Sequence, residues 1–125
     1  MKEIISTPNA PAAIGAYSQA VKVNGMLFAS GQLGINPQTG DFAGADFRSQ
    51  AEQSLKNVKA IVEAAGSSMD KVVKVSVFMA DMADFATLNE VYGQYFPSPY
   101  PARSAVAVKT LPKGGLIEIE VIAEL

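Results

Sequence analysis

The dipeptide Asn24-Gly25 lies between the apolar runs "AVKV" and "MLFA", and it limits the possible folds more than any other feature. Asn-Gly between apolar runs is the strongest short-range signal for a β-hairpin with a type I′ turn. A two-residue turn fixes the register, so the strand that ends at Val23 is expected to pair directly with the strand that starts at Met26. The chain must therefore build part of its structure as an antiparallel sheet.

Two segments have the spacing of amphipathic helices. Between Asp46 and Ala65, apolar residues recur every three or four positions, which places them on one stripe. Asp46 can cap the start of this helix, and Gly66 can close its end. A second helix is expected from Met82 to Phe96, capped by Asp81 and stopped by the proline-rich segment that follows it.

The remaining apolar segments are expected to be strands, at Ile4–Ser6, 71–79, 102–108 and 116–125. In the strand between the helices, alternate residues from Val73 to Met79 form one continuous apolar face. Strands thus come in hairpins with helices in between, which predicts an α+β fold.

The expected form is one mixed β-sheet with two helices packed on one face, in a single domain that covers residues 1–125. Helices on one side leave the other face of the sheet uncovered. Only 18% of the residues are charged, and a small domain with few surface charges often hides part of its surface in an oligomer. We therefore expect partner subunits against the uncovered face.

The amino-acid composition excludes several kinds of active site. The 125 residues include no Cys and no His, which rules out thiol nucleophiles, histidine general bases and zinc sites built on either residue. Acid–base chemistry falls to Asp, Glu, Tyr or Lys. A net charge of −2 with no cluster of Lys and Arg argues against nucleic-acid binding. With neither a secretory signal nor a membrane span in the sequence, we expect a soluble, cytoplasmic protein.

Arg103 is the unusual polar residue of a predicted strand. Strand alternation puts it on the same face as Ala105 and Ala107, two small residues that leave space around it. Two interpretations are open: an edge-strand arginine that reaches into water along its apolar stem, or a clamp for an anion. The pattern alone favours the first, because most arginines are solvated.

Two glutamates and a few loop residues complete the candidates. Glu118 and Glu120 share one face of the last strand, where the ordinary interpretation is two solvated side chains. The functional alternative is one partly buried glutamate whose raised pKa lets it serve as base and then as acid. Tyr17 could hydrogen-bond a ligand from its loop, while Ser30 and Gly31 end a strand where a backbone N–H can approach an anion.

Several stretches resemble the RidA family, the YjgF-type reactive intermediate deaminases. The most specific is the C-terminal signature, which consists of Pro101-Ala102-Arg103-Ser104, Val106, Lys109, Leu111 and Ile117-Glu118-Ile119. Similar stretches are "NAPAAIGAYSQAV", "SGQLGINPQTG", "QSLKNVKAIVEAAG" and "VFMADMADFATLNEVY". The resemblance spans essentially the whole chain. It implies a chorismate-mutase-like α+β fold and a homotrimer with a central β-barrel, whose sites lie in clefts between subunits.

The resemblance also implies an activity, since family members of this subgroup hydrolyse 2-imino acids to 2-oxo acids and ammonia. The expected function is a cofactor-independent 2-iminobutanoate/2-iminopropanoate deaminase with no metal. By the family motif, Arg103 corresponds to the residue that grips the substrate carboxylate, and Ser30 and the backbone N–H of Gly31 to its helpers. Glu118 corresponds to the residue that orients and activates water.

The resemblance further assigns Tyr17 and Asn89 to the wall of the pocket, with Asn89 coming from the second helix. One departure from the family is Ala105, because many relatives carry Cys at that position. Two alternatives stay open: a non-catalytic trimer that binds small carboxylates and regulates a partner, and the ribonuclease or translation inhibitor described for some family members. The small net charge argues against the last of these.

Overall fold

The computed structural model describes residues 1–125, which form one seven-stranded sheet and two α-helices. The strands are β1 (Glu3–Ile5), β2 (Ala20–Val23), β3 (Met26–Ala29), β4 (Gln32–Leu33), β5 (Val72–Met79), β6 (Ala102–Ala107) and β7 (Ile117–Glu124). The α-helices are α1 (Phe47–Ala64) and α2 (Phe85–Tyr95), and 3₁₀ turns occur at Met69–Lys71, Met82–Asp84 and Pro112–Gly114. None of the helices is both long and apolar enough to cross a bilayer.

The β2–β3 hairpin forms as the sequence predicts. Asn24 and Gly25 have φ angles of 51° and 74°, and a type I′ turn requires positive values at both positions. Val23 pairs directly with Met26, which confirms the expected register. β1 then adds to the outer edge of this hairpin.

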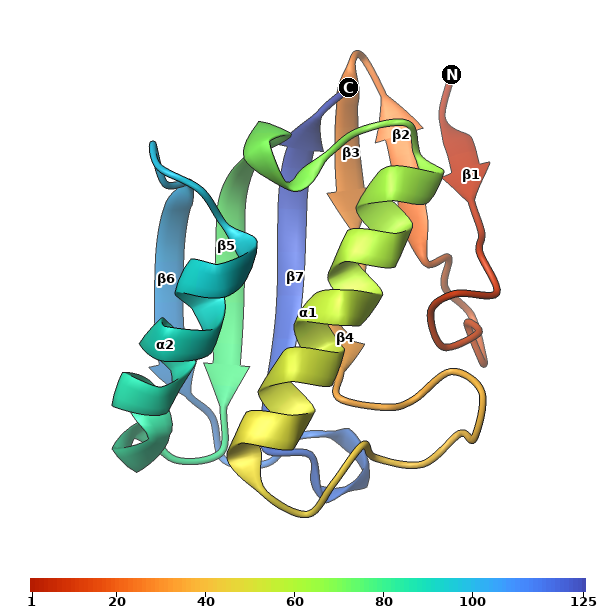
Figure 1. The fold of residues 1–125 in the computed structure, drawn as a ribbon. Coiled ribbons are helices and arrows are strands. Elements are labelled where there is room, and N and C mark those ends of the chain that lie inside the picture. Colours follow the sequence, from red (N-terminus) through yellow and green to blue (C-terminus); the bar gives the residue numbers. More distant parts are fainter.

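The strands lie in the order β1-β2-β3-β7-β5-β6, and β4 also pairs with β7. All neighbouring strands are antiparallel except β5 and β6. Parallel neighbours need a crossover connection, and α2 lies in the crossover between them. The mixed sheet is confirmed, with β7 between β3 and β5 (Figure 1).

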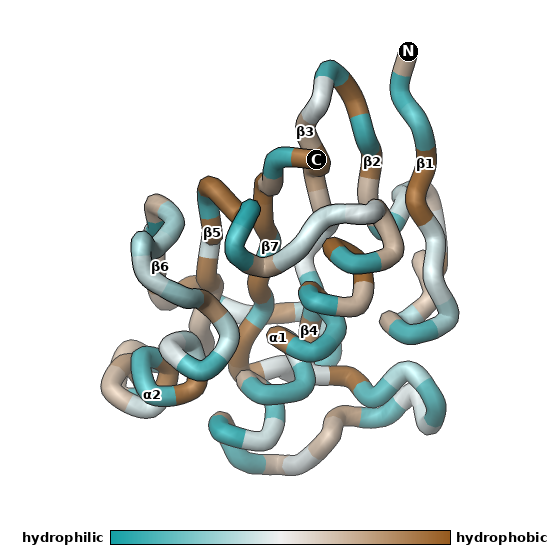
Figure 2. The backbone as a smooth tube through the Cα atoms, turned by 45° about the horizontal axis from the view of Figure 1, so that its top comes forward, coloured by the Kyte–Doolittle hydropathy of each residue, from teal (hydrophilic) through white to brown (hydrophobic).

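Both helices lie on one face of the sheet, with α1 in front of β7 and β3, and α2 in front of β5 and β6 (Figure 1). The apolar stripe of α1 is buried against the sheet, through Phe47, Ala51, Leu55, Val58, Ile61 and Val62. Hydrophobic residues also run along β5 and β7 behind the helices (Figure 2). The core therefore fills the space between the helices and one face of the sheet, as the patterns predict.

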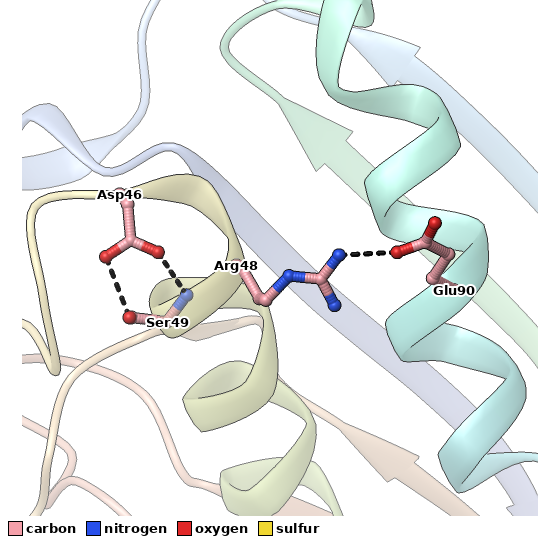
Figure 3. Close-up of polar contacts among 4 residues, drawn as sticks. All are labelled: Asp46, Arg48, Ser49 and Glu90. Carbon is pink, nitrogen blue, oxygen red and sulfur yellow. Dashed lines mark hydrogen bonds and ion pairs between the residues drawn. The ribbon is translucent and has the colours of Figure 1, made fainter.

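The caps of α1 are those that the sequence predicts. The Asp46 carboxylate accepts a hydrogen bond from the backbone N–H of Ser49 at 3.0 Å and another from the Ser49 hydroxyl at 2.7 Å (Figure 3). The same hydrogen bonds lower the pKa of Asp46. Beyond the other end, Gly66 has a φ of 83°, a value that glycine adopts without strain.

Two expected elements differ in detail. The second helix is divided: Met82–Asp84 forms a 3₁₀ turn, capped by the Asp81 carboxylate, and α2 proper starts at Phe85. The strand β5 has a shift of register between Val72 and Lys74, typical of a β-bulge. The irregularity makes Val72 buried and Val73 only half-buried, so the apolar face does not begin at Val73 as predicted.

The opposite face of the sheet is uncovered within the chain. Along β7, Ile117, Ile119, Val121 and Ala123 are buried, so the alternate residues, among them Glu118 and Glu120, face the other side. Large apolar side chains on this face are exposed, with Phe28 at 44% and Val106 at 48%. The expected bare face is confirmed, and subunits that would cover it remain a prediction.

Candidate active site

Arg103 lies on β6, at the edge of the sheet, with its side chain on the side of the helices. Its pairing partner on β5 is Val75, which is fully buried in the core, so both side chains lie on the same face. The Arg103 Nη1 atom donates a hydrogen bond to the Asn89 side-chain oxygen at 2.9 Å. A helix residue therefore holds the guanidinium of a strand residue in place.

Two aromatic rings of α2 also hold this guanidinium. The Arg103 Cζ atom lies 4.8 Å from the centre of the Tyr92 ring and 5.4 Å from that of Phe85. Both distances are within the range of a cation–π interaction. The contacts fix the position of the charge without neutralising it.

No carboxylate of the chain pairs with Arg103, because the only ion pair joins Arg48 to Glu90. Arg103 is nevertheless half-buried, and arginines are seldom buried without a partner. A guanidinium has five N–H donors, of which Asn89 takes one. The remaining donors match a carboxylate in geometry and charge, which is what the anion-clamp interpretation of this residue requires.

A cavity of about 480 Å³ opens beside the guanidinium. Its wall consists of residues from α2 and from the segment that leads into β6, which are Asn89, Tyr92, Gly93, Tyr100, Pro101 and Arg103. Of these residues, only Arg103 carries a charge at neutral pH. The cavity is thus a single cationic site with aromatic and apolar surroundings.

Glu118 lies on the opposite face of the sheet, where it pairs with Phe78 of β5 and Leu33 of β4. It is half-buried, and burial raises the pKa of its carboxyl group. The nearby charge of Glu120 raises the pKa of Glu118 further, as a smaller effect. A carboxyl group with a raised pKa is a better proton acceptor than an ordinary carboxylate and can return the proton afterwards, which is what acid–base catalysis needs.

Glu118 lines a second cavity, of about 730 Å³, together with Tyr17, Ser30 and Gly31. The chain thus brings together four of the six residues expected in the site. Tyr17 is 53% exposed and contributes its side chain to this wall from a loop. The Ser30 hydroxyl donates a 2.6 Å hydrogen bond to the carbonyl of Ser18, so its proton is already engaged.

Gly31 lies directly against Glu118. A Cβ atom added to Gly31 would be 2.8 Å from the Glu118 Cδ atom and 2.9 Å from its Cγ atom. Real Cβ atoms do not approach other carbons this closely, since their optimal separation is about 3.5–4.0 Å. The absence of a side chain at Gly31 is therefore what leaves room for Glu118 in its present position.

Arg103 and Glu118 do not meet within one chain. Val75, the partner of Arg103, and Phe78, the partner of Glu118, are three positions apart on β5 and so point to opposite faces. The structure forms two half-sites, one with Arg103 and Asn89, the other with Tyr17, Ser30, Gly31 and Glu118. A complete site of the expected kind needs a half-site from each of two chains.

The sequence patterns missed several residues of these half-sites. Phe85 and Tyr92 fall on the apolar stripe of the second helix, a pattern that predicts only a place in the core, yet both rings also contact Arg103. Lys113 lines the Glu118 cavity with a φ of 57°, a left-handed conformation that is uncommon outside glycine. The signal for Lys113 was its place before two glycines, which mark a turn but not its proximity to Glu118.

Comparisons with known proteins agree on one family. Residues 7–125 match the family described as Endoribonuclease L-PSP. The chain is 54% identical over 123 residues to a RutC family protein of Pyrococcus horikoshii, covering 98% of each chain. It is 50% identical to the 2-iminobutanoate/2-iminopropanoate deaminase of Bos taurus, covering 98% of this chain and 90% of the bovine protein. The crystal structure of E. coli TdcF with bound serine superposes with a TM-score of 0.93 and 49% identity, covering 98% of each chain.

Proposed function

Because the chain belongs to the Endoribonuclease L-PSP family, which includes the RidA proteins, we propose that it is a 2-iminobutanoate/2-iminopropanoate deaminase. In this proposal it hydrolyses reactive enamine and imine intermediates to 2-oxo acids and ammonia. The observation that carries the proposal is Arg103, a half-buried cation held by an amide and two rings with no carboxylate partner. Relatives at about half identity that are named as imine deaminases support it.

The substrate carboxylate binds to Arg103 in this proposal. Two N–H groups of a guanidinium can donate to both oxygens of a carboxylate, which fixes its plane as well as its position. Charge-assisted hydrogen bonds of this kind contribute about 1.5–3 kcal/mol. Loss of the clamp in Arg103→Ala is therefore expected to lower kcat/KM by roughly 10- to 100-fold.

Glu118 serves first as the base and then as the acid. It takes a proton from water as the water oxygen bonds to the imine carbon, and the C=N electron pair moves to nitrogen. Glu118 gives this proton to the nitrogen, which yields the neutral carbinolamine. Glu118 then takes the proton of the new hydroxyl group and gives it to the nitrogen as well, so that the C–N bond breaks, ammonia leaves with the electron pair of that bond, and the C=O group forms. Imine and water thus yield oxo acid and ammonia, with no oxidant or reductant. A positioned group of this kind contributes about 10²–10⁴ in rate.

We place the working site between two copies of the chain in a homotrimer. The two half-sites lie on opposite faces of one sheet, so Arg103 of one copy must meet Glu118 of a partner for both to contact one substrate. The exposed apolar residues of the uncovered face, such as Phe28, support burial against other copies. Trimeric closure gives each pair of neighbours one complete site.

Mixed trimers test this arrangement. Arg103→Ala and Glu118→Ala subunits are co-expressed with different tags, and trimers that contain both are purified and assayed for 2-oxo acid release behind a threonine dehydratase. Neither variant alone has a complete site, whereas each mixed trimer has one neighbouring pair with both residues. The expected result is about one third of the parental rate.

The control mixes Glu118→Ala subunits with subunits that carry both substitutions, which leaves no complete site. Mixed trimers no faster than this control would contradict a site shared between chains. A Glu118→Ala protein as fast as the parent that still binds 2-oxo acids through Arg103 would instead support the alternative, a non-catalytic trimer that binds small carboxylates.

A further inference from the structure

The connection between β1 and β2, residues 6–19, is a long loop with no helix or strand of its own (Figure 1). The two strands are antiparallel neighbours, so the two ends of the loop lie side by side. Residues 12–17 are exposed in the single chain, with Ile14 at 81%. This exposed part nevertheless supplies Ile14 and Tyr17 to the wall of the Glu118 cavity, so something must fix its position.

Few hydrogen bonds hold this loop. Within residues 7–18 the only backbone–backbone hydrogen bond is a local one, from the N–H of Tyr17 to the carbonyl of Gly15. Near the end of the loop, the Ser30 hydroxyl donates to the carbonyl of Ser18. All other hydrogen bonds from residues 7–18 to the rest of the chain go to one side chain, that of Gln19.

The Gln19 side chain bonds to the loop with both ends of its amide, and the residue is only 3% exposed. Its Oε1 atom accepts from the backbone N–H of Thr7 at 2.6 Å. Its Nε2 atom donates to the carbonyls of Thr7, Ala10 and Pro11, at 3.1, 3.3 and 2.8 Å. A neutral amide has both donors and an acceptor, so one glutamine can pair with both kinds of backbone group in a loop that lacks a partner strand.

These hydrogen bonds close the exposed part of the loop on itself. Gln19 is the last residue of the loop, and its side chain reaches back to the carbonyl of Pro11. Residues 11–19 thus have ends that meet, which is the arrangement of an Ω-loop. Closing a loop reduces the conformations open to the residues inside it, and Tyr17 is one of them.

We propose that Gln19 is a positioning residue for the Glu118 half-site: its buried amide closes the loop of residues 11–19 and so holds Tyr17 in the wall of the cavity. Gln19 lines neither of the two cavities, so it acts through the loop and not on the substrate. The inference rests on the proposed function only for the choice of ligand, because any ligand that contacts Tyr17 needs the same closure.

A fluorescent residue in the loop reports on this closure. The chain contains no Trp, so Ile14→Trp introduces a single fluorophore on the exposed part of the loop. Its anisotropy is measured in Ile14→Trp alone and in combination with Gln19→Leu or Gln50→Leu. Gln50 is the matched control, because it is also buried and its amide also joins two backbone groups, the carbonyl of Gly44 and the N–H of Leu116, outside this loop.

Gln19→Leu should lower the anisotropy, because the opened loop moves more freely, whereas Gln50→Leu should leave it unchanged. With Ile14 intact, Gln19→Leu should also weaken the binding of 2-oxobutanoate, measured by titration calorimetry, by about 2- to 10-fold, the contribution of one hydrogen bond. In a Tyr17→Ala background the same substitution should cost no further affinity. Unchanged anisotropy, or an equal loss of affinity with and without Tyr17, would overturn the proposal.

Amide hydrogen exchange in the parent decides the question if Gln19→Leu does not fold. The Thr7 N–H bonds to Gln19 and the Leu116 N–H bonds to Gln50, so these two amides form a matched pair. Saturation with 2-oxobutanoate should slow exchange more at Thr7 than at Leu116, because a ligand against Tyr17 suppresses opening of the loop. Equal slowing would contradict the positioning role. A parent that turns over no imine refutes the proposed deaminase, while anisotropy and affinity still decide on Gln19.

Discussion

Substitution of Gly31 by alanine separates two roles that this residue can have in catalysis. Alanine keeps the backbone N–H, so a role as hydrogen-bond donor to the substrate survives the change. The added Cβ atom lies 2.8 Å from the Glu118 Cδ atom, against an optimal separation of about 3.5 Å or more. The shortfall is about 0.7 Å, and the Glu118 side chain, which can rotate, is the group that must move.

Displacement of Glu118 predicts a specific kinetic result. Gly31→Ala should lower kcat by about 10²–10⁴, the contribution of a positioned acid–base group, with little change in KM. Its cost in folding stability should be about 1–3 kcal/mol, which is typical of an overpacked site. Steady-state kinetics of 2-oxo acid release and urea unfolding followed by circular dichroism measure the two effects.

A double-mutant cycle with Glu118→Ala supplies the control. The three atoms nearest to the added Cβ, at 2.8–3.2 Å, are Cδ, Cγ and Oε1 of Glu118, so truncation of Glu118 to alanine removes these close contacts. In that background, Gly31→Ala should affect neither rate nor stability, and the coupling energy should be about 1–3 kcal/mol. Full activity of Gly31→Ala, or an equal loss of rate with and without Glu118, would refute the reasoning.

Three further predictions follow from single contacts. Tyr92→Phe should keep activity and stability, because the buried Tyr92 hydroxyl has no hydrogen-bond partner and the ring contact with Arg103 remains. Tyr92→Leu removes the ring and should raise KM by about 5-fold or more. Steady-state kinetics of both variants distinguish the contribution of the ring from that of the hydroxyl. Glu120→Gln removes one cause of the raised pKa of Glu118, so the acidic limb of the kcat/KM profile should move to lower pH; an unmoved limb would exclude Glu118 as the titrating base. Because folding raises the pKa of Glu118, the folded parent should lose stability as the pH rises through the pKa of Glu118 in the folded state. Glu118→Gln should therefore unfold at a higher urea concentration than the parent when the pH is above that pKa. In acid, where Glu118 is protonated in the parent, the two proteins should unfold at the same urea concentration.

Local patterns predicted most of the fold because their physical causes are local. The Asn24-Gly25 turn, the Asp46 cap and the stripe of α1 each depend on a few neighbouring residues, and each forms as predicted. The bulge in β5 did not follow from the sequence, since Val72 and Val73 have the same side chain and only the ladder with β7 decides which is buried. The burial of a single strand residue depends on how its strand pairs with a distant one, so the sequence predicts it less well than it predicts turns and helices.

The candidate site shows the same limit more sharply. The family motifs predict Arg103 and Glu118 as site residues. Strand alternation predicts which neighbours share a face with each of them on its own strand. Whether those two faces coincide depends on how β6 and β7 pair with β5, and this register is a long-range property. The separation of the two residues onto opposite faces is therefore visible only in the assembled sheet, whereas sites between subunits were expected from the family resemblance and not from the strand patterns.

The charge of Arg103 stays available because nearby carboxylates are directed elsewhere. Glu90 follows Asn89 on α2, and consecutive helix residues do not share a face. Glu90 points toward α1, where it forms an ion pair with Arg48 (Figure 3). Such an exposed ion pair adds at most about 1 kcal/mol to stability. Its main consequence is that the Glu90 carboxylate pairs with Arg48 and not with Arg103. Arg103 donates to the neutral amide of Asn89 instead, which positions the guanidinium and leaves its charge unpaired for the carboxylate that we propose it binds.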